Sequence, residues 1–167
     1  MKLRDHRFFF NMIWLIILIT IPLPLIITVD NGLETLSSSS EIMGINFGVF
    51  AYTWMLSAIY LSSQPKWLDR IIGLPDMYII HGVTAVFAVV FMWLHDNMLI
   101  SAGLISLTGD ISLYMFTAIL VYSLVFMAGW LTSRVKFLMT IKKGLEKIFK
   151  HELSMWLHRL NLVATLL

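Results

Sequence analysis

Cysteine is absent from this chain of 167 residues, and charged residues make up only 13% of it. The missing cysteine excludes disulfides, thiolate metal sites, iron–sulfur clusters and a covalent C-x-x-C-H haem attachment. An ordinary soluble domain carries about twice this share of charged residues. With 59% hydrophobic residues and a mean hydropathy of +0.84, a soluble fold of this length could not bury its apolar surface. The composition therefore predicts an integral membrane protein.

Apolar residues gather in five segments that polar connections separate at nearly regular intervals. We expect an all-α bundle of about five transmembrane helices, over residues 8–28, 44–61, 77–99, 111–131 and 153–167. Pro22 and Pro24 should kink or end the first helix. The fifth segment has 15 residues, which span about 22 Å as a helix against a hydrocarbon core of about 30 Å. We therefore expect an incomplete fifth span, in a chain that is a truncated fragment.

Lysine and arginine occur in alternate connections. The N-terminus and the second and fourth connections hold them, whereas the first and third hold acidic residues, such as Asp30 and Asp110, and no base. The positive-inside rule then predicts a cytoplasmic N-terminus, which we place at a bacterial plasma membrane. Residues 135–150 mix lysine with apolar residues, which predicts a basic amphipathic helix on the membrane surface before the last span. Because topology accounts for the basic charge, we expect no nucleic-acid partner.

His81 and His95 lie fourteen positions apart in the third segment. On an α-helix this step returns to nearly the same face, within about 40°, and rises roughly 21 Å. His158 comes early in the fifth segment, at the depth of His81 in this topology. Ionisable side chains inside spans are rare and usually functional, and two imidazoles at one depth can hold a haem iron. The alternative for each histidine is a hydrogen-bonded polar residue between packed helices.

Other residues near these histidines are weaker candidates. Arg159 is a candidate partner for a haem propionate, and snorkelling to the interface is its alternative role. Phe87 and Phe91 lie between the two histidines of the third segment, where they line a path between haems or simply pack. Three glycines are candidates for close approach of a helix or a porphyrin: Gly48, Gly82 and Gly129.

Two stretches resemble a known family. The sequence Leu-Pro-Asp-Met-Tyr-Ile-Ile-His over residues 74–81, followed by His95, resembles the third helix of the ferric reductase-like transmembrane domain. Trp-Leu-His-Arg-Leu over residues 156–160 resembles the start of that family's fifth helix. The family includes ferric reductases, the membrane half of NADPH oxidases and the haem subunit of the periplasmic methionine sulfoxide reductase system.

The resemblance implies two b-type haems stacked across the membrane, each held by one histidine of the third helix and one of the fifth. Carried onto this chain, His81 and His158 hold the iron of the inner haem, and His95 binds one side of the outer haem. Arg159 would line the inner haem site. The family's fourth ligand would fall at position 171 or 172, so this chain could hold at most one complete haem b site, and the second site lacks a ligand.

The chain departs from the family in further respects. A sixth span and a flavin or nicotinamide domain are missing, and no G-x-G-x-x-G motif occurs. We therefore expect residues 1–167 to form a single transmembrane haem-binding domain. FAD and NAD(P)H would act only through a missing domain or a partner, such as a cytoplasmic flavoprotein electron donor.

The leading hypothesis is a membrane haem protein that carries electrons from the cytoplasmic side to an acceptor outside, as the membrane part of an oxidoreductase. It contacts membrane lipid, and we predict no catalytic residue in it. A second hypothesis is a small transporter or proton relay that uses His81, His95 and His158, which predicts a colourless protein with pH-dependent conductance. A third is an inactive fragment, which predicts neither haem nor flux.

Overall fold

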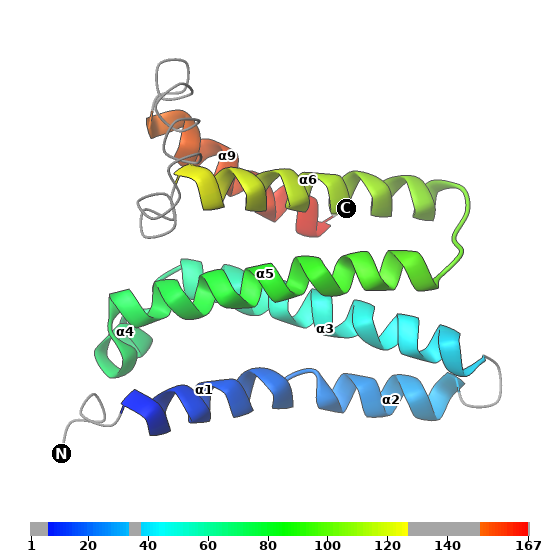
Figure 1. Cartoon of the computed structure of the whole chain (residues 1–167), viewed down its shortest axis with the longest axis horizontal. Coiled ribbons are helices and arrows are strands. Elements are labelled where there is room, and N and C mark those ends of the chain that lie inside the picture. The colour runs from blue at the N-terminus through cyan, green and yellow to red at the C-terminus, as the bar shows by residue number, and fades with distance from the viewer. Residues whose placement is uncertain (1–6, 34–37, 127–150, 167) are drawn as a thin grey trace. The chain divides into compact units, whose positions relative to one another are not determined.

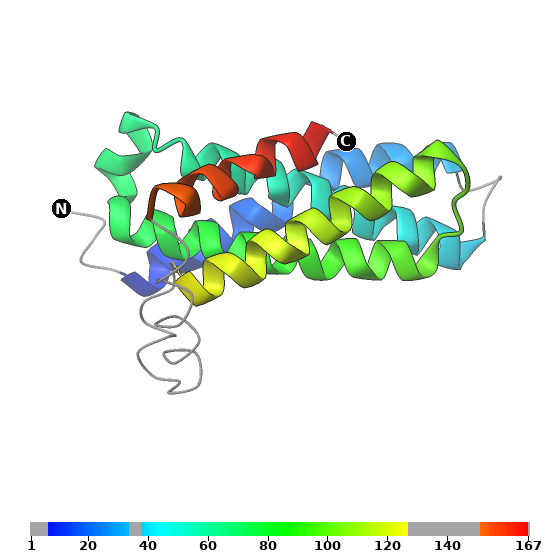
Figure 2. The same ribbon diagram turned by 90° about the horizontal axis from the view of Figure 1, so that it is seen from above.

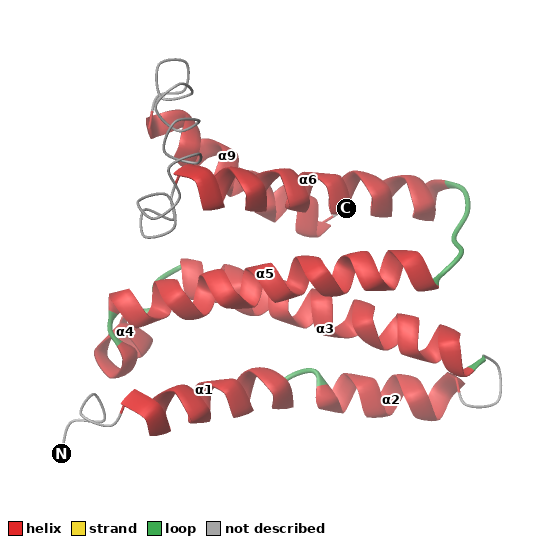
Figure 3. Cartoon of the chain, in the orientation of Figure 1, coloured by secondary structure: helices red, strands yellow, loops and turns green. Residues whose placement is uncertain are grey.

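A computed structural model describes residues 7–33, 38–126 and 151–166 of the protein. Within these residues every regular element is a helix (Figure 3), which confirms the predicted all-α class for the part described. In chain order the helices are α1 (Arg7–Thr20), α2 (Leu23–Leu33), α3 (Ser39–Ser62), α4 (Lys66–Ile72), α5 (Leu74–Met98), α6 (Leu104–Phe126) and α9 (His151–Leu166).

Four segments of the described residues are long and apolar enough to cross a membrane: Met12–Leu33, Ser39–Ser62, Leu74–Met98 and Leu104–Leu124. Large apolar side chains stand on the surface of the first segment, where Ile16 is 62% and Ile27 59% exposed. Such a surface is unfavourable in water and ordinary in lipid. The chain is therefore an all-α integral membrane protein. The helix α9, with 16 residues, is shorter than these four segments, and the expected fifth span stays a prediction.

The chain divides into two compact units, Met1–Ile100 and Ser101–Leu167. In the first unit, α3 and α5 run antiparallel and side by side, with the short α4 at the bend between them (Figures 1 and 2). In the second unit, α6 packs against α9, and the Ser112 hydroxyl donates a 2.6 Å hydrogen bond to the Ala164 carbonyl. The most extensive helix packing is thus between α3 and α5 in the first unit and between α6 and α9 in the second.

The first span is broken at its prolines, as predicted. The helix α1 ends at Thr20, and α2 begins at Leu23. Pro24 is the second residue of α2, where a missing backbone N–H costs nothing because that group has no partner within the helix. Pro22 lies in the turn and cannot donate to the carbonyl four residues earlier, at Leu18. The indole Nε1 of Trp54 on α3 donates to that oxygen instead, at 2.8 Å.

Local signals fix the ends of α3 and α5. The Ser38 hydroxyl accepts from the Glu41 backbone N–H, and the Glu41 carboxylate accepts from the Ser38 N–H, which forms a capping box before α3. Gly73, at φ 87°, provides the left-handed turn between α4 and α5. Pro75 then occupies the first turn of α5, where its fixed φ suits a helix start.

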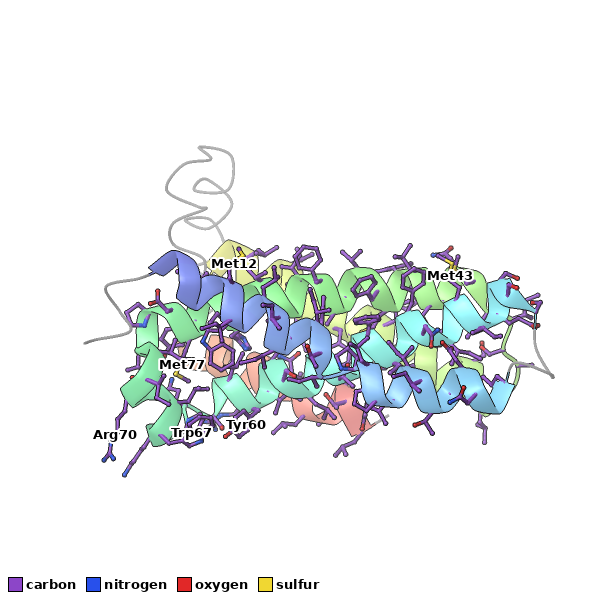
Figure 4. The ribbon with its side chains drawn as sticks, turned by 90° about the horizontal axis from the view of Figure 1, so that it is seen from below. Met12, Met43, Tyr60, Trp67, Arg70 and Met77 are labelled. Atoms are coloured by element: carbon purple, nitrogen blue, oxygen red, sulfur yellow. The ribbon has the colours of Figure 1, made fainter. Side chains whose placement is uncertain are left out.

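The short helix α4 has one buried face and one exposed face. Leu68 and Ile72 are buried with Met77 in one apolar cluster. Trp67 and Arg70 project away from the helices at this end of the unit, whereas Met43 lies at the opposite end (Figure 4). The Trp67 indole donates to the Tyr60 hydroxyl at 2.9 Å. Aromatic and basic side chains of this kind suit a membrane interface.

The structure corrects two placements made from the sequence. Asp30 lies within α2 and Asp110 within α6, whereas both were expected in connections. The helices continue past their apolar stretches, because hydropathy marks the depth of lipid and not the last hydrogen-bonded residue. Asp30 accepts a 2.8 Å hydrogen bond from the Asn46 amide of α3. The predicted amphipathic helix over 135–150 lies outside the described residues.

Candidate functional site

The two histidines of α5 both contact α3. His81 and His95 are half-buried, and α5 is continuous between them. The Nδ1 atom of His81 lies 2.8 Å from the Ala58 carbonyl oxygen, and Nδ1 of His95 lies 2.9 Å from the Gly44 carbonyl oxygen. Because a carbonyl oxygen only accepts, each Nδ1 must donate. The proton then sits on Nδ1, and in the neutral ring the lone pair is on Nε2.

The two hydrogen bonds share a single helix register. His95 follows His81 by fourteen positions, and Ala58 follows Gly44 by fourteen positions. Because α3 and α5 run in opposite directions, moving back fourteen residues on α5 corresponds to moving forward fourteen residues on α3. Both contacts therefore belong to one helix register. The histidines therefore repeat one local geometry at two depths, roughly 21 Å apart along the axis.

Glycine lets α3 approach α5 closely at the His95 level. A Cβ atom placed on Gly48 would lie 2.7 Å from His95 Nδ1 and 2.8 Å from Cε1. A Cβ atom placed on Gly44, one turn earlier, would lie 2.9 Å from the Cβ of Met98. Small residues four apart let membrane helices pack with their backbones close together. The structure thus supports the expected close approach at Gly48, whereas Gly82 faces open space and Gly129 lies outside the described residues.

An aromatic cluster occupies the α3–α5 interface between the levels of the two histidines. Its ring centroids are 5.2 to 6.0 Å apart, in stacked, tilted and edge-on pairs. Such contacts stabilise packing beyond burial alone. The members are Phe47, Phe50 and Trp54 from α3, with Phe87 and Phe91 from α5.

The other predicted site residues belong to the second unit. His158 and Arg159 lie in α9. The Arg159 side chain is exposed, and for His158 the structure describes only the helical backbone. The pairing of His158 with His81 and of Arg159 with a haem propionate therefore stay predictions.

A bare metal ion and a haem iron need different numbers of protein ligands. Among the side chains that the structure describes, no three from His, Cys, Asp and Glu come together. Haem iron already has four porphyrin nitrogens and needs only one or two axial imidazoles. The paired Nδ1–carbonyl contacts suit the second requirement.

Sequence reasoning missed the partners of the histidines. Backbone carbonyls carry no residue signature, so Ala58 and Gly44 were not identified as acceptors. A usable signal was present, because these two small residues repeat the fourteen-residue spacing of the histidines on the preceding span. Trp54 was also missed, although an interior tryptophan and a proline on a neighbouring span offer a donor and an unpaired acceptor.

No protein-family model, no curated protein and no solved structure matches this chain. The ferric reductase-like resemblance covers most of the chain in hydropathy, but its specific motifs occupy only residues 74–95 and 156–167.

Proposed function

We propose that this chain is a b-type haem protein that moves electrons across a membrane, with His81 and His95 as axial ligands of two haems. One observation carries the proposal. Both imidazoles of α5 donate Nδ1–H to backbone carbonyls of α3, at 2.8 and 2.9 Å. Metal-binding histidines almost always donate their other ring N–H in this way, which fixes the ring and raises the basicity of the metal-binding nitrogen.

The second axial ligand of the inner haem would be His158, as the resemblance implies, and Arg159 would pair with a propionate. An iron held by two imidazoles has no open coordination position, which favours electron transfer over oxygen binding. The haem supplies the redox chemistry, and the chain supplies ligands at two depths. The two sites would lie roughly 21 Å apart along α5, with the aromatic cluster between them.

The direction of transfer follows from charge. By the positive-inside rule the basic residues would lie on the cytoplasmic side, and His81 would then be nearer the donor and His95 nearer the acceptor. A flavoprotein that oxidises NAD(P)H is the expected class of donor. The expected acceptors are ferric iron, oxygen or a quinone-like molecule, on the outer side.

The interior of the α3–α5 interface argues against a proton relay between these histidines. A relay needs a chain of groups that exchange protons. The buried residues of α5 between the two imidazoles are instead Thr84, Ala88 and Val89, and two of these three have apolar side chains. The hydroxyl of Thr84, one turn from His81, is buried and has no hydrogen-bond partner, so it links neither histidine to the other.

A haem-binding titration tests the proposal. The purified chain in detergent, mixed with haemin, should give the reduced-minus-oxidised spectrum of a low-spin b-type cytochrome. His81→Ala and His158→Ala should abolish that spectrum, because each removes one axial ligand. His6→Ala, outside the four apolar segments, is the matched control and should leave it unchanged.

Two results would contradict the proposal. The first is an unchanged spectrum in His81→Ala. The second is a wild-type chain that binds no haem and conducts protons in liposomes, with the conductance lost in His81→Ala. The latter would favour the relay hypothesis.

A further inference from the structure

We propose that Gly48 is a positioning residue that sets the imidazole of His95. Gly48 lies one turn from Gly44 on the same face of α3. Its missing side chain leaves the space in which the His95 ring lies, because an added Cβ would come within 2.7 Å of Nδ1 and 2.8 Å of Cε1. These distances are below ordinary contact, so a side chain at residue 48 and the present ring position exclude each other.

Gly44 and Gly48 then act together on one ring. The Gly44 carbonyl accepts the Nδ1–H at 2.9 Å, which selects the tautomer. Gly48 admits the ring to within reach of that carbonyl. A methyl group at residue 48 must displace the ring or separate the helices, and either movement lengthens the same hydrogen bond. The expected consequence is loss of the fixed tautomer at His95.

The two histidines differ in this respect. The shared register places His95 against Gly44 and Gly48, and it places His81 against Ala58. On α3, glycine therefore lies opposite His95 but not opposite His81. We infer that the orientation of His95 depends on residue 48, while His81 keeps its contact with the Ala58 carbonyl when residue 48 changes.

The positioning of His95 by Gly44 and Gly48 involves only α3 and α5. The role of His95 in iron binding, in contrast, rests on the proposed function. The two can be tested apart. Nitrogen NMR of the haem-free chain, with ¹⁵N-labelled histidine and His95→Ala for assignment, reports the tautomer without any ligand. Wild type should show His95 protonated at Nδ1 in slow exchange with water. Gly48→Ala should lose that signal and keep the corresponding signal of His81.

Gly82→Ala is the matched control. Gly82 is also a glycine inside a membrane helix, next to His81, but an added Cβ there meets nothing within 4 Å. This variant should leave both histidine signals in place. Retention of the His95 Nδ1–H signal in Gly48→Ala, or an equal loss in Gly82→Ala, would overturn the proposal.

A double-mutant cycle covers the case in which Gly48→Ala folds poorly. In the His95→Ala background the ring is gone, so the methyl group at residue 48 meets no imidazole. Gly48→Ala should then lower the unfolding midpoint in the wild-type background and leave it unchanged in the His95→Ala background. Equal lowering in both backgrounds would show that Gly48 serves helix packing alone, and would overturn the role in positioning.

Haem binding supplies the final distinction. If haem binds at the His95 level, Gly48→Ala should shift the spectrum of that site and leave the His81 site as in wild type. If Gly48→Ala loses the His95 Nδ1–H signal and no form of the protein binds haem, the positioning role of Gly48 is supported and the proposed function fails. If haem binds and the His95 tautomer is the same in Gly48→Ala as in wild type, the proposed function stands and the role of Gly48 fails.

Discussion

At the scale of single residues, backbone carbonyls accept hydrogen bonds from three side chains that join helices of the first unit. Ala58 and Gly44 accept from histidines, and Leu18 accepts from Trp54. The Leu18 carbonyl has no helical donor because residue 22 is proline, and lipid offers no water to replace one, so the contact with Trp54 matters for stability. The sequence identified His81 and His95 as unusual, but their acceptors depend on which spans pack together, which composition does not encode.

Trp54→Phe tests this view at the break of the first span. Phenylalanine keeps an aromatic ring for the cluster but cannot donate to the Leu18 carbonyl, which Pro22 leaves without a helical donor. We expect the free energy of unfolding in detergent to fall by about 1 kcal/mol. Trp67→Phe is the matched control, since its indole donates to the exposed Tyr60 hydroxyl, and water can replace it. The control should change stability by less than about 0.5 kcal/mol; an equal loss in both variants would contradict the account.

At the scale of elements, hydropathy and proline position predicted most of the helices. The spans around α3, α5 and α6 follow from continuous apolar stretches, and the break between α1 and α2 follows from Pro22 and Pro24. The sequence did not reveal α4, because seven residues are too few for a periodic signal to stand out. It also did not reveal the common register of α3 and α5, since glycine spacing alone does not name the partner helix.

Gly44→Ala tests the close packing of that helix pair. The added methyl group would lie 2.9 Å from Met98 Cβ and 3.1 Å from Leu99 Cγ, and a Cβ cannot move without its backbone. We expect a loss of about 1–3 kcal/mol in the free energy of unfolding. The control Gly32→Ala, where an added Cβ meets nothing within 4 Å, should be neutral or gain up to about 1 kcal/mol from helix propensity. A neutral Gly44→Ala would show that the helices are further apart than described.

At the scale of the whole molecule, two helix pairs in separate units hold the predicted ligands. His81 and His95 belong to the first unit, and His158 to the second. The membrane class was predictable from composition, because lipid requires long apolar helices. The joining of His81 and His158 across units was predicted from topology and resemblance, and it stays a prediction.

The absence of cysteine makes the orientation directly testable. Single cysteines at exposed serines of two connections, Ser63→Cys before α4 and Ser101→Cys before α6, would be the only thiols in the chain. The positive-inside rule predicts that an impermeant maleimide labels Ser101→Cys from outside intact cells. It should label Ser63→Cys only after the membrane is opened. The reverse labelling, or labelling of both from outside, would contradict the orientation and the direction of electron transfer.

The most direct test of the central claim is pulsed EPR of the ferric haem-loaded chain, with ¹⁵N-labelled histidine. Because Nδ1 of His81 contacts the Ala58 carbonyl at 2.8 Å, the proposed haem site would bind iron through Nε2. The account predicts strong coupling of a low-spin iron to Nε2 of two histidines, with a protonated Nδ1 on His81, and loss of that signal in His81→Ala. Coupling to Nδ1, or a low-spin iron signal that survives His81→Ala, would contradict the claim.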